Sequence, residues 1–255
     1  MKFATFNVNG VNARLPRLVE WLAEAKPDVV GLQEIKAEEA RFPRQEIEAA
    51  GYQLLLKGQK GFNGVAILSR QPAQLVADSL PGDAEDQQAR WIEAIIGDVH
   101  FVSLYLPNGN PAPGPKFDYK LTWMDRMADR AAELLASGRP VLLAGDFNIC
   151  PTDFDAARPD LLAGDALVLP EARGRFRTLV SAGWTDAIRA ANPGQPCYTY
   201  WDYQGGAWAK NWGMRIDHLL LSPAAADRML GCGIDRHARG TERASDHVPV
   251  FVTLA

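Results

Sequence analysis

Short apolar runs that end in polar residues recur along the chain. Residues 29–32 and 141–144 are uninterrupted apolar runs of the kind found in strands buried on both faces. Residues 2–8 predict a further strand at the start of the sequence. Between the strands predicted at residues 2–8 and 29–32, apolar side chains recur at the i, i+3, i+4, i+7 spacing of an amphipathic helix. This helix carries Leu15, Leu18, Val19 and Leu22.

The remainder of the chain predicts more strands and two further helices. The strands are expected at residues 52–56, 65–68, 91–96, 99–106, 198–203, 214–221 and 248–254. Gly97-Asp98 is a strong hairpin signal between two of them. Helices are expected at about 117–136 and 171–181, and the segment 108–115, rich in proline and glycine, must be a loop.

The order of these elements predicts an α/β fold. We see no Ser/Gly-rich linker and no low-complexity tract, so we expect residues 1–255 to form a single catalytic domain. The buried-looking strands outnumber what one sheet would easily accommodate. We therefore predict two sheets packed face to face with helices outside.

Composition excludes several classes of protein. Of the 255 residues, 47% are hydrophobic and 23% are charged, which fits a globular chain and argues against disorder or a coiled coil. The net charge of -4 provides no global basic field for nucleic acid, although a local basic stripe can serve that purpose. No apolar run approaches the length needed to span a membrane.

The cysteines and the N-terminus favour a reducing compartment. The three cysteines are odd in number and lack CxxC spacing, so we expect reduced, non-catalytic thiols at Cys150, Cys197 and Cys232. The sequence starts without a basic segment followed by an apolar one, which argues against a secretory signal. We expect a cytoplasmic protein.

Carboxylates and amides gather where apolar strands end. They are Asn7, Glu34, Asp146, Asn148, Asp217 and Asp246, with His247 after the last. Several converging carboxylates need a cation, since a carboxylate that is buried alone costs several kcal/mol or becomes neutral. Ligand sets made only of oxygen favour Mg²⁺ or Mn²⁺, and pairs of Cys and His at zinc spacing are absent.

Each of these residues also has an ordinary structural interpretation. Asp146 can be a turn residue, Glu34 a salt-bridged strand end, and Asp246-His247 a surface or capping pair. Asp217, in the middle of a predicted strand, is harder to explain in this way, because unpaired buried acids are rare. The residues gain weight from occurring together and in this order.

Six short motifs in order resemble a known family. They are Asn-Val-Asn-Gly at Asn7, Leu-Gln-Glu at Glu34, Tyr-Leu-Pro-Asn-Gly at Tyr105, Gly-Asp-Phe-Asn at Asp146, Arg-Ile-Asp at Asp217 and Ser-Asp-His at Asp246. The chain resembles the exonuclease III branch of the endonuclease/exonuclease/phosphatase superfamily from Met1 to its final strand. Gln-Lys-Gly-Phe-Asn-Gly-Val-Ala at Gln59 and Tyr-Thr-Tyr-Trp-Asp-Tyr at Tyr198 are more particular to its DNA-repair members.

The resemblance implies a four-layer α/β/β/α sandwich and metal-dependent cleavage of DNA. The expected substrate is double-stranded DNA with abasic sites, incised 5′ to the site, or with 3′ ends that an exonuclease or 3′-phosphatase activity trims. We expect a monomer with no membrane association, and no obligate protein partner is evident.

Roles for the motif residues also follow from the resemblance. Glu34 would hold the metal with Asn7 nearby, and Asp246 is a second candidate ligand. Asp146 would deprotonate water, and Asn148 would fix its position. The two are also possible ligands, as is His247. His247 would contact the scissile phosphate with Asp217 paired to it, while Tyr105 would donate a proton to the phosphate or to the leaving oxygen.

Candidates for substrate binding flank Asp217. The resemblance places Tyr200, Met214 and Ile216 at the pocket for a flipped-out abasic sugar, where an apolar wall rejects a full nucleotide on size. Trp201 could equally be a core residue. Among the basic residues, Lys36 and Arg215 are the best candidates for phosphate contacts, ahead of a wider set. That set is Arg14, Lys57, Lys60, Lys116, Lys120 and Lys210.

Two alternatives to this function remain open. A phosphodiesterase of the same superfamily could act on RNA, an inositol phosphate or a sphingolipid. The inositol phosphatases usually carry a Trp-Cys-Asp-Arg type motif where this chain has Met-Arg-Ile-Asp, and no amphipathic membrane-binding helix is evident. A catalytically inactive DNA-binding relative would lack one of the site residues, and here all are present.

Overall fold

The computed structural model describes residues 1–255 and contains two mixed sheets of six strands each. The first sheet has the order β11 (Met229–Ile234), β12 (Val250–Leu254), β1 (Lys2–Asn7), β2 (Val29–Gln33), β4 (Val65–Ser69), β3 (Gln53–Lys57). The second has the order β5 (Ala73–Ala77), β6 (Trp91–Ile96), β7 (Val99–Tyr105), β8 (Val141–Asp146), β10 (Asp217–Leu221), β9 (Thr185–Asp186).

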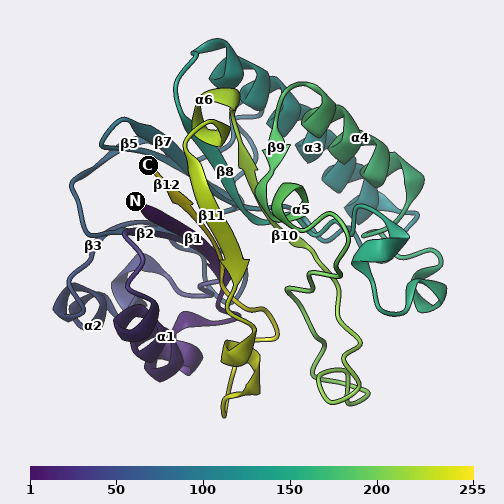
Figure 1. Cartoon of the computed structure of the whole chain (residues 1–255), viewed down its shortest axis with the longest axis horizontal. Helices are drawn as coiled ribbons and strands as arrows, with labels where there is room; N and C mark the ends of the chain where they lie inside the picture. Colours follow the sequence, from purple (N-terminus) through teal and green to yellow (C-terminus); the bar gives the residue numbers. More distant parts are fainter.

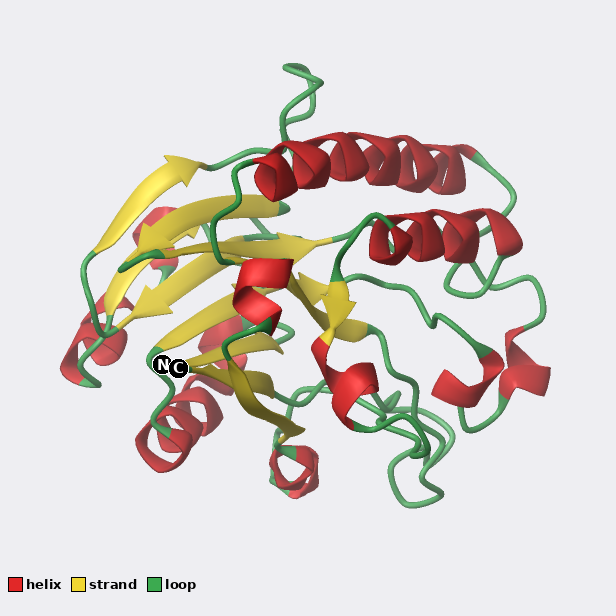
Figure 2. Cartoon of the chain, turned by 45° about the horizontal axis from the view of Figure 1, so that its top comes forward, coloured by secondary structure: helices red, strands yellow, loops and turns green.

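Helices cover the outer faces of both sheets. Figure 1 shows α1 (Val11–Ala25) and α2 (Arg44–Ala49) on one side, and α3 (Pro115–Ala136) and α4 (Pro170–Ser181) on the other. The short helices are α5 (Ala187–Ala191), α6 (Pro223–Ala226), and the 3₁₀ turns η1 (Glu39–Arg41), η2 (Asp153–Asp155), η3 (Pro159–Leu162) and η4 (Arg236–Gly240). The predicted sandwich of sheets and outer helices is confirmed, and Figure 2 shows the helices outside the strands.

Three buried clusters account for the layers. One lies between the sheets and includes Phe3 of β1 and Phe101 of β7, whose rings stack at 5.8 Å. A second joins the first sheet to the apolar face of α1, with Leu18, Trp21 and Leu22. A third joins the second sheet to α3 and α4. Burial of these apolar faces on both sides of each sheet is the main force that holds the layers together.

The structure corrects two of the predicted strands. Residues 198–203 form no strand, because Tyr200 makes only isolated bridges to Met214 and His247. The strand predicted at 214–221 begins only at Asp217. The shorter pairing leaves the segments around Tyr200 and Met214 free to line a cavity instead of continuing a sheet.

Two expectations about the whole chain can be compared with the structure. All three cysteines are free thiols, and Cys150 and Cys197 are buried. No helix has the length and apolar character that crossing a bilayer would require.

Candidate active site

The polar residues singled out in the sequence meet at one end of both sheets. β1 runs parallel to β2, and β7 runs parallel to β8, so the carboxyl ends of each pair lie at the same edge. Asn7 ends β1 and Glu34 follows β2. Asp146 ends β8 and lies opposite Asp217, the first residue of antiparallel β10. The pairing of the strands therefore brings together side chains that are far apart in the sequence.

Asn7 connects the two sheets at this edge. Its Nδ2 donates to Glu34 Oε1 at 2.8 Å and to Asp146 Oδ2 at 2.9 Å. Its Oδ1 accepts from the backbone N–H of Asn9. In this arrangement Asn7 orients both carboxylates, and its own oxygen is already used within the turn that follows β1.

Asp146 lies in the interior of the site. The residue is 1% exposed, and its Oδ1 accepts from the backbone N–H of Asn148 at 2.8 Å. Burial raises the pKa of Asp146 to about 7, and the charges of Asp217 and Glu34 act in the same direction. The charge of His247 opposes that rise. A carboxyl group with a pKa near neutrality is suited to accept and release a proton at physiological pH.

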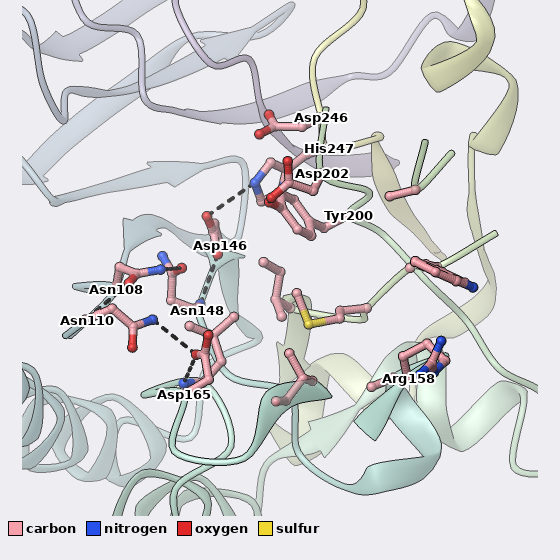
Figure 3. Close-up of a pocket in the computed structure, with 18 of the residues that line it drawn as sticks. Asn108, Asn110, Asp146, Asn148, Arg158, Asp165, Tyr200, Asp202, Asp246 and His247 are labelled. Atoms are coloured by element: carbon pink, nitrogen blue, oxygen red, sulfur yellow. Dashed lines mark hydrogen bonds and ion pairs between the residues drawn. The ribbon is translucent and has the colours of Figure 1, made fainter. Parts of the chain in front are cut away.

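His247 is held in one orientation by a carboxylate beneath it. Its Nδ1 lies 2.9 Å from Asp217 Oδ2, and Thr199 Oγ1 donates to the same oxygen at 2.6 Å. Burial disfavours the charged imidazole, but the carboxylates of Asp217 and Asp146 raise the pKa of His247 well above its usual value. The Nε2 atom is directed toward Asp146, 3.7 Å from Oδ2 (Figure 3). The sequence prediction that Asp217 pairs with His247 is confirmed.

Glu34 occupies the more open side of the site. Its carboxylate pairs with Lys36 Nζ at 2.8 Å, and its side chain retains 17% exposure. Burial opposes the charged form, yet the hydrogen bonds from Lys36 and Asn7 leave the pKa of Glu34 below its usual value. Lys36 also donates to Asn9, whose amide donates to Asp246 at 2.9 Å. Asp246 is thus linked to Glu34 through a cation and an amide.

Three of these groups could share a cation. Glu34, Asp146 and His247 offer ligand atoms that all lie within 4.8 Å of one another. Two carboxylates beside a wide cavity fit a hard divalent ion that retains water ligands. Asp246, another predicted ligand, lines the same cavity but lies outside this group of three. The two predicted amide ligands are already hydrogen-bonded, Asn7 to Asp146 and Asn148 to the carbonyl of Leu106.

Asn148 and Tyr105 complete the polar end of the cavity. Asn148 has a φ of 47°, and its side chain donates to Leu106 O at 2.9 Å and accepts from Asn108 at 3.0 Å. Tyr105 ends β7, and the guanidinium of Arg90 lies 4.7 Å from the centre of its ring. Burial and the charges of Glu34 and Asp146 raise the pKa of Tyr105, so its hydroxyl keeps its proton and can donate it.

An apolar wall faces these polar groups across a cavity of about 600 Å³ (Figure 3). Tyr200, Met214 and Ile216 belong to this wall, as the sequence suggested. The Tyr200 ring packs against His247 with ring centroids 4.9 Å apart. The wall is extended by Ala156, Leu161, Leu162, Leu167 and Trp212. A reactive polar end thus opens onto an apolar chamber.

Comparison with known proteins places the chain in a family. The model of the endonuclease/exonuclease/phosphatase family matches residues 4–247. The chain belongs to this family. It is 35% identical to exodeoxyribonuclease III of Haemophilus influenzae over 98% of both chains. The resemblance drawn from the six motifs is confirmed.

Solved structures agree with this membership of the endonuclease/exonuclease/phosphatase family. An AP endonuclease from Archaeoglobus fulgidus superimposes with a TM-score of 0.95 at 32% identity, covering 100% of this chain and 99% of that one. The 3′ phosphatase NExo from Neisseria, bound to product DNA hairpin, gives a TM-score of 0.97 at 36% identity with the same coverage.

The prediction that Arg215 contacts phosphate is wrong. Arg215 is 1% exposed, and its guanidinium pairs with Asp155 at 2.7 Å and Asp186 at 2.6 Å. It also donates to His218 Nδ1 at 2.9 Å, and burial together with this guanidinium lowers the pKa of His218 to about 4. Arg215 therefore fixes the start of the Arg-Ile-Asp stretch to Asp155 and Asp186 instead of reaching a ligand.

Lys120, from the wider set of basic candidates, is also buried, at 0% exposure. Its Nζ donates to the carbonyls of Asn108, Asn148 and Ala166 at 3.0, 2.6 and 3.1 Å. Burial lowers the pKa of this amine to about 7. Lys120 fastens three loops around the cavity. Trp201, for which two interpretations were open, is fully buried.

Several residues that the structure brings into the site were not predicted from the sequence. Thr199 holds Asp217, Asn9 links Lys36 to Asp246, and Asn108 holds Asn148. Asn9 and Asn108 lie inside motifs already noted, so their neighbours were the available signal. Thr199 likewise lies inside the Tyr-Thr-Tyr-Trp-Asp-Tyr motif at Tyr198. A lone Arg carries no such signal, which is why Arg158, on the far side of the cavity in Figure 3, was not identified.

Proposed function

We propose that the protein is a Mg²⁺- or Mn²⁺-dependent DNA phosphodiesterase that incises the backbone 5′ to abasic sites. We further propose 3′-to-5′ exonuclease and 3′-phosphatase activities of the same site. The observation that carries the proposal is the buried set of Asp146, His247 and Asp217 facing Glu34 at the mouth of a cavity with an apolar wall. The names of the similar proteins, exodeoxyribonuclease III, AP endonuclease and 3′ phosphatase, support the choice of DNA.

Each polar group has a proposed role in hydrolysis. Glu34 would hold the divalent ion, which supplies charge stabilisation at the phosphate oxygens when bound. Asp146 accepts a proton from the attacking water, and Asn148 positions that water. His247 donates from Nε2 to a phosphate oxygen, and Tyr105 donates to the phosphate or to the leaving oxygen. Asp217 and Thr199 are positioning residues: Thr199 holds the Asp217 carboxylate, which accepts from His247 Nδ1 and leaves Nε2 directed toward Asp146.

The apolar wall of the cavity favours an abasic sugar as the group that enters it. Tyr200, Met214 and Ile216 offer no hydrogen-bonding edge that could read a base, apart from one phenol group. A sugar without its base fits against such a wall, and a complete nucleotide adds polar groups that would lose their water without gaining partners. We propose that residues 1–255 act as one catalytic unit on double-stranded DNA.

The test is a comparison of three substrates in one assay. The protein is incubated with an abasic duplex, an intact blunt duplex and a duplex carrying a 3′-phosphate, with Mg²⁺ or with excess chelator. We expect Mg²⁺-dependent incision of the abasic duplex and no cleavage in chelator. Full activity in chelator, or an abasic duplex left intact in Mg²⁺, would overturn the proposal.

A further inference from the structure

A second depression lies beside the cavity and is lined by three arginines but by no acidic residue. Arg14 comes from α1, Arg239 from η4, and Arg243 from the segment that leads to Asp246, with Tyr203 between them. We refer to these four residues as the arginine depression. It encloses about 450 Å³. In Figure 1, η4 (yellow) lies between α1 and the loop that carries Tyr203.

The arginine depression concentrates positive charge in a chain whose net charge is -4. None of its three guanidinium groups forms an ion pair with a carboxylate, although arginines elsewhere do, for example Arg44 with Glu48. Like charges that share one concavity repel each other unless an anion binds between them. The absence of acidic partners therefore points to an anion from outside the chain.

Three of the four side chains of the arginine depression are held in place before any ligand binds. The hydroxyl of Tyr203 donates to Ala244 O at 2.9 Å and accepts from Arg14 Nη2 at 3.0 Å. Arg14 Nε is buried and has no hydrogen-bond partner. Arg239 donates to Trp201 O and lies 5.1 Å from the centre of the Tyr203 ring. Because these groups are already ordered, binding an anion costs little further entropy.

The arginine depression is close to the proposed reaction centre. Arg243 precedes His247 by four residues, so their Cα atoms are at most about 14 Å apart even in an extended chain. Tyr203 follows Tyr200, which packs against His247, by three residues. A DNA strand carries a phosphate every 3.4 Å or so along the helix axis, so this distance spans only a few nucleotides.

We propose that the arginine depression binds one backbone phosphate of the DNA strand, a few nucleotides from the phosphate that is cleaved. This inference rests on the proposed function, because it takes DNA as the ligand. Arginine suits the task, since its planar fork of donors matches phosphate oxygens. A contact of this kind carries no sequence information. It fixes the register in which the duplex presents its abasic site to His247.

The experiment measures the affinity for an abasic duplex as a function of salt, in Ca²⁺ to limit cleavage. The variant combines Arg14→Gln with Arg243→Gln. The loss of one phosphate contact should make the slope of log affinity against log salt shallower by about 0.9. The matched control combines Arg44→Gln with Arg175→Gln, which removes two paired exposed arginines on α2 and α4. The control should keep the native slope, and an unchanged slope in the Arg14/Arg243 variant would overturn the inference.

A second measurement identifies the phosphate. Neutral methylphosphonates replace the backbone phosphates one position at a time, and affinity is measured for the native protein and for the Arg14/Arg243 variant. We expect one position near the abasic site at which the methylphosphonate weakens binding by the native protein. At that position the affinity of the variant should not fall further. If the variant stays as sensitive as the native protein at every position, the arginine depression does not bind DNA phosphate. A native protein that neither binds nor cleaves the duplex would contradict the proposed function itself.

Discussion

Glu34 and Asp146 are two carboxylates bridged by the same amide of Asn7, yet their surroundings differ in almost every respect. Glu34 lies at the open side of the site beside Lys36, and its pKa is below the usual value. Asp146 is buried between the sheets near His247, and burial raises its pKa to about 7. The first group stays ionised, whereas the second is close to its titration midpoint at neutral pH.

The difference suggests that the two carboxylates do separate work. A permanently charged, solvent-accessible oxygen suits the capture of a cation, and a buried group with a raised pKa suits proton transfer. The supports differ accordingly. Lys36 holds Glu34 through a partly exposed pair. The segments that carry Asp217 and Asp146 are instead fixed by buried side chains, because Arg215 pairs with Asp155 and Lys120 donates to the carbonyl of Asn148.

The largest effect should come from the buried support. Arg215→Met leaves the carboxylates of Asp155 and Asp186 buried with fewer partners, which should lower the free energy of unfolding by about 3–5 kcal/mol. Lys36→Met removes a partly exposed pair and should cost no more than about 1 kcal/mol. Urea unfolding of both variants measures the difference. Equal losses would show that the two sides of the site are supported alike.

Removal of the imidazole should come next. His247→Asn removes a donor that acts on the transition state, so kcat should fall by at least about a hundredfold, or roughly 2.7 kcal/mol. Affinity for an abasic duplex should change little, because ground-state binding uses other contacts. Single-turnover cleavage and a binding titration in Ca²⁺ provide the two readouts. If binding and cleavage decline in parallel, His247 holds substrate and is not part of the chemistry.

The open carboxylate should affect the metal and leave the fold unaltered. Glu34→Gln replaces a charged ligand by a neutral one, so the affinity for Mn²⁺ should weaken by about tenfold or more. Calorimetric titration of the DNA-free protein with Mn²⁺ measures this change directly. Glu38→Gln, an exposed acid just outside the site, serves as the control. Native Mn²⁺ affinity in the Glu34 variant would remove Glu34 from the ligand set.

A smaller effect concerns stability and pH without metal. A raised carboxyl pKa means that the folded state prefers the protonated form, so ionised Asp146 costs stability increasingly as pH rises from about 4 to about 7. Asp146→Asn removes that cost. In chelator its Tm should exceed the native value by more at pH 8 than at pH 5, by roughly 2 °C or more. An advantage that is equal at both pH values would show that Asp146 is not strained by its charge.

The sequence anticipated the layers and much of the site, and its failures have physical causes. Apolar runs such as Val29–Gln33 identify buried strands, because burial on both faces excludes polar residues. β5 was missed, since it lies at a sheet edge with mostly exposed side chains. The extent of pairing around Tyr200 depends on contacts with Met214 and His247 that are distant in sequence.

Burial of charged residues was the main error within the site. Arg215 and Lys120 are basic residues of the type that contacts DNA phosphates. Only the fold reveals that Arg215 pairs with Asp155 and Asp186 and that Lys120 donates to backbone carbonyls. The arginine depression could not be predicted from the sequence either. Arg14 was one candidate among many, and nothing in the sequence brings it next to Arg243.

The division of labour between Glu34 and Asp146 is the central claim, and one measurement tests it directly. Single-turnover cleavage of an abasic duplex is followed for Glu34→Gln and Asp146→Asn while Mg²⁺ is raised from limiting to saturating. The Glu34 variant should recover most of its rate at high Mg²⁺, because its defect is in binding the ion. The Asp146 variant should remain at least about a hundredfold slow at saturation, because its defect is in proton transfer. Recovery of both variants, or of neither, would contradict the claim.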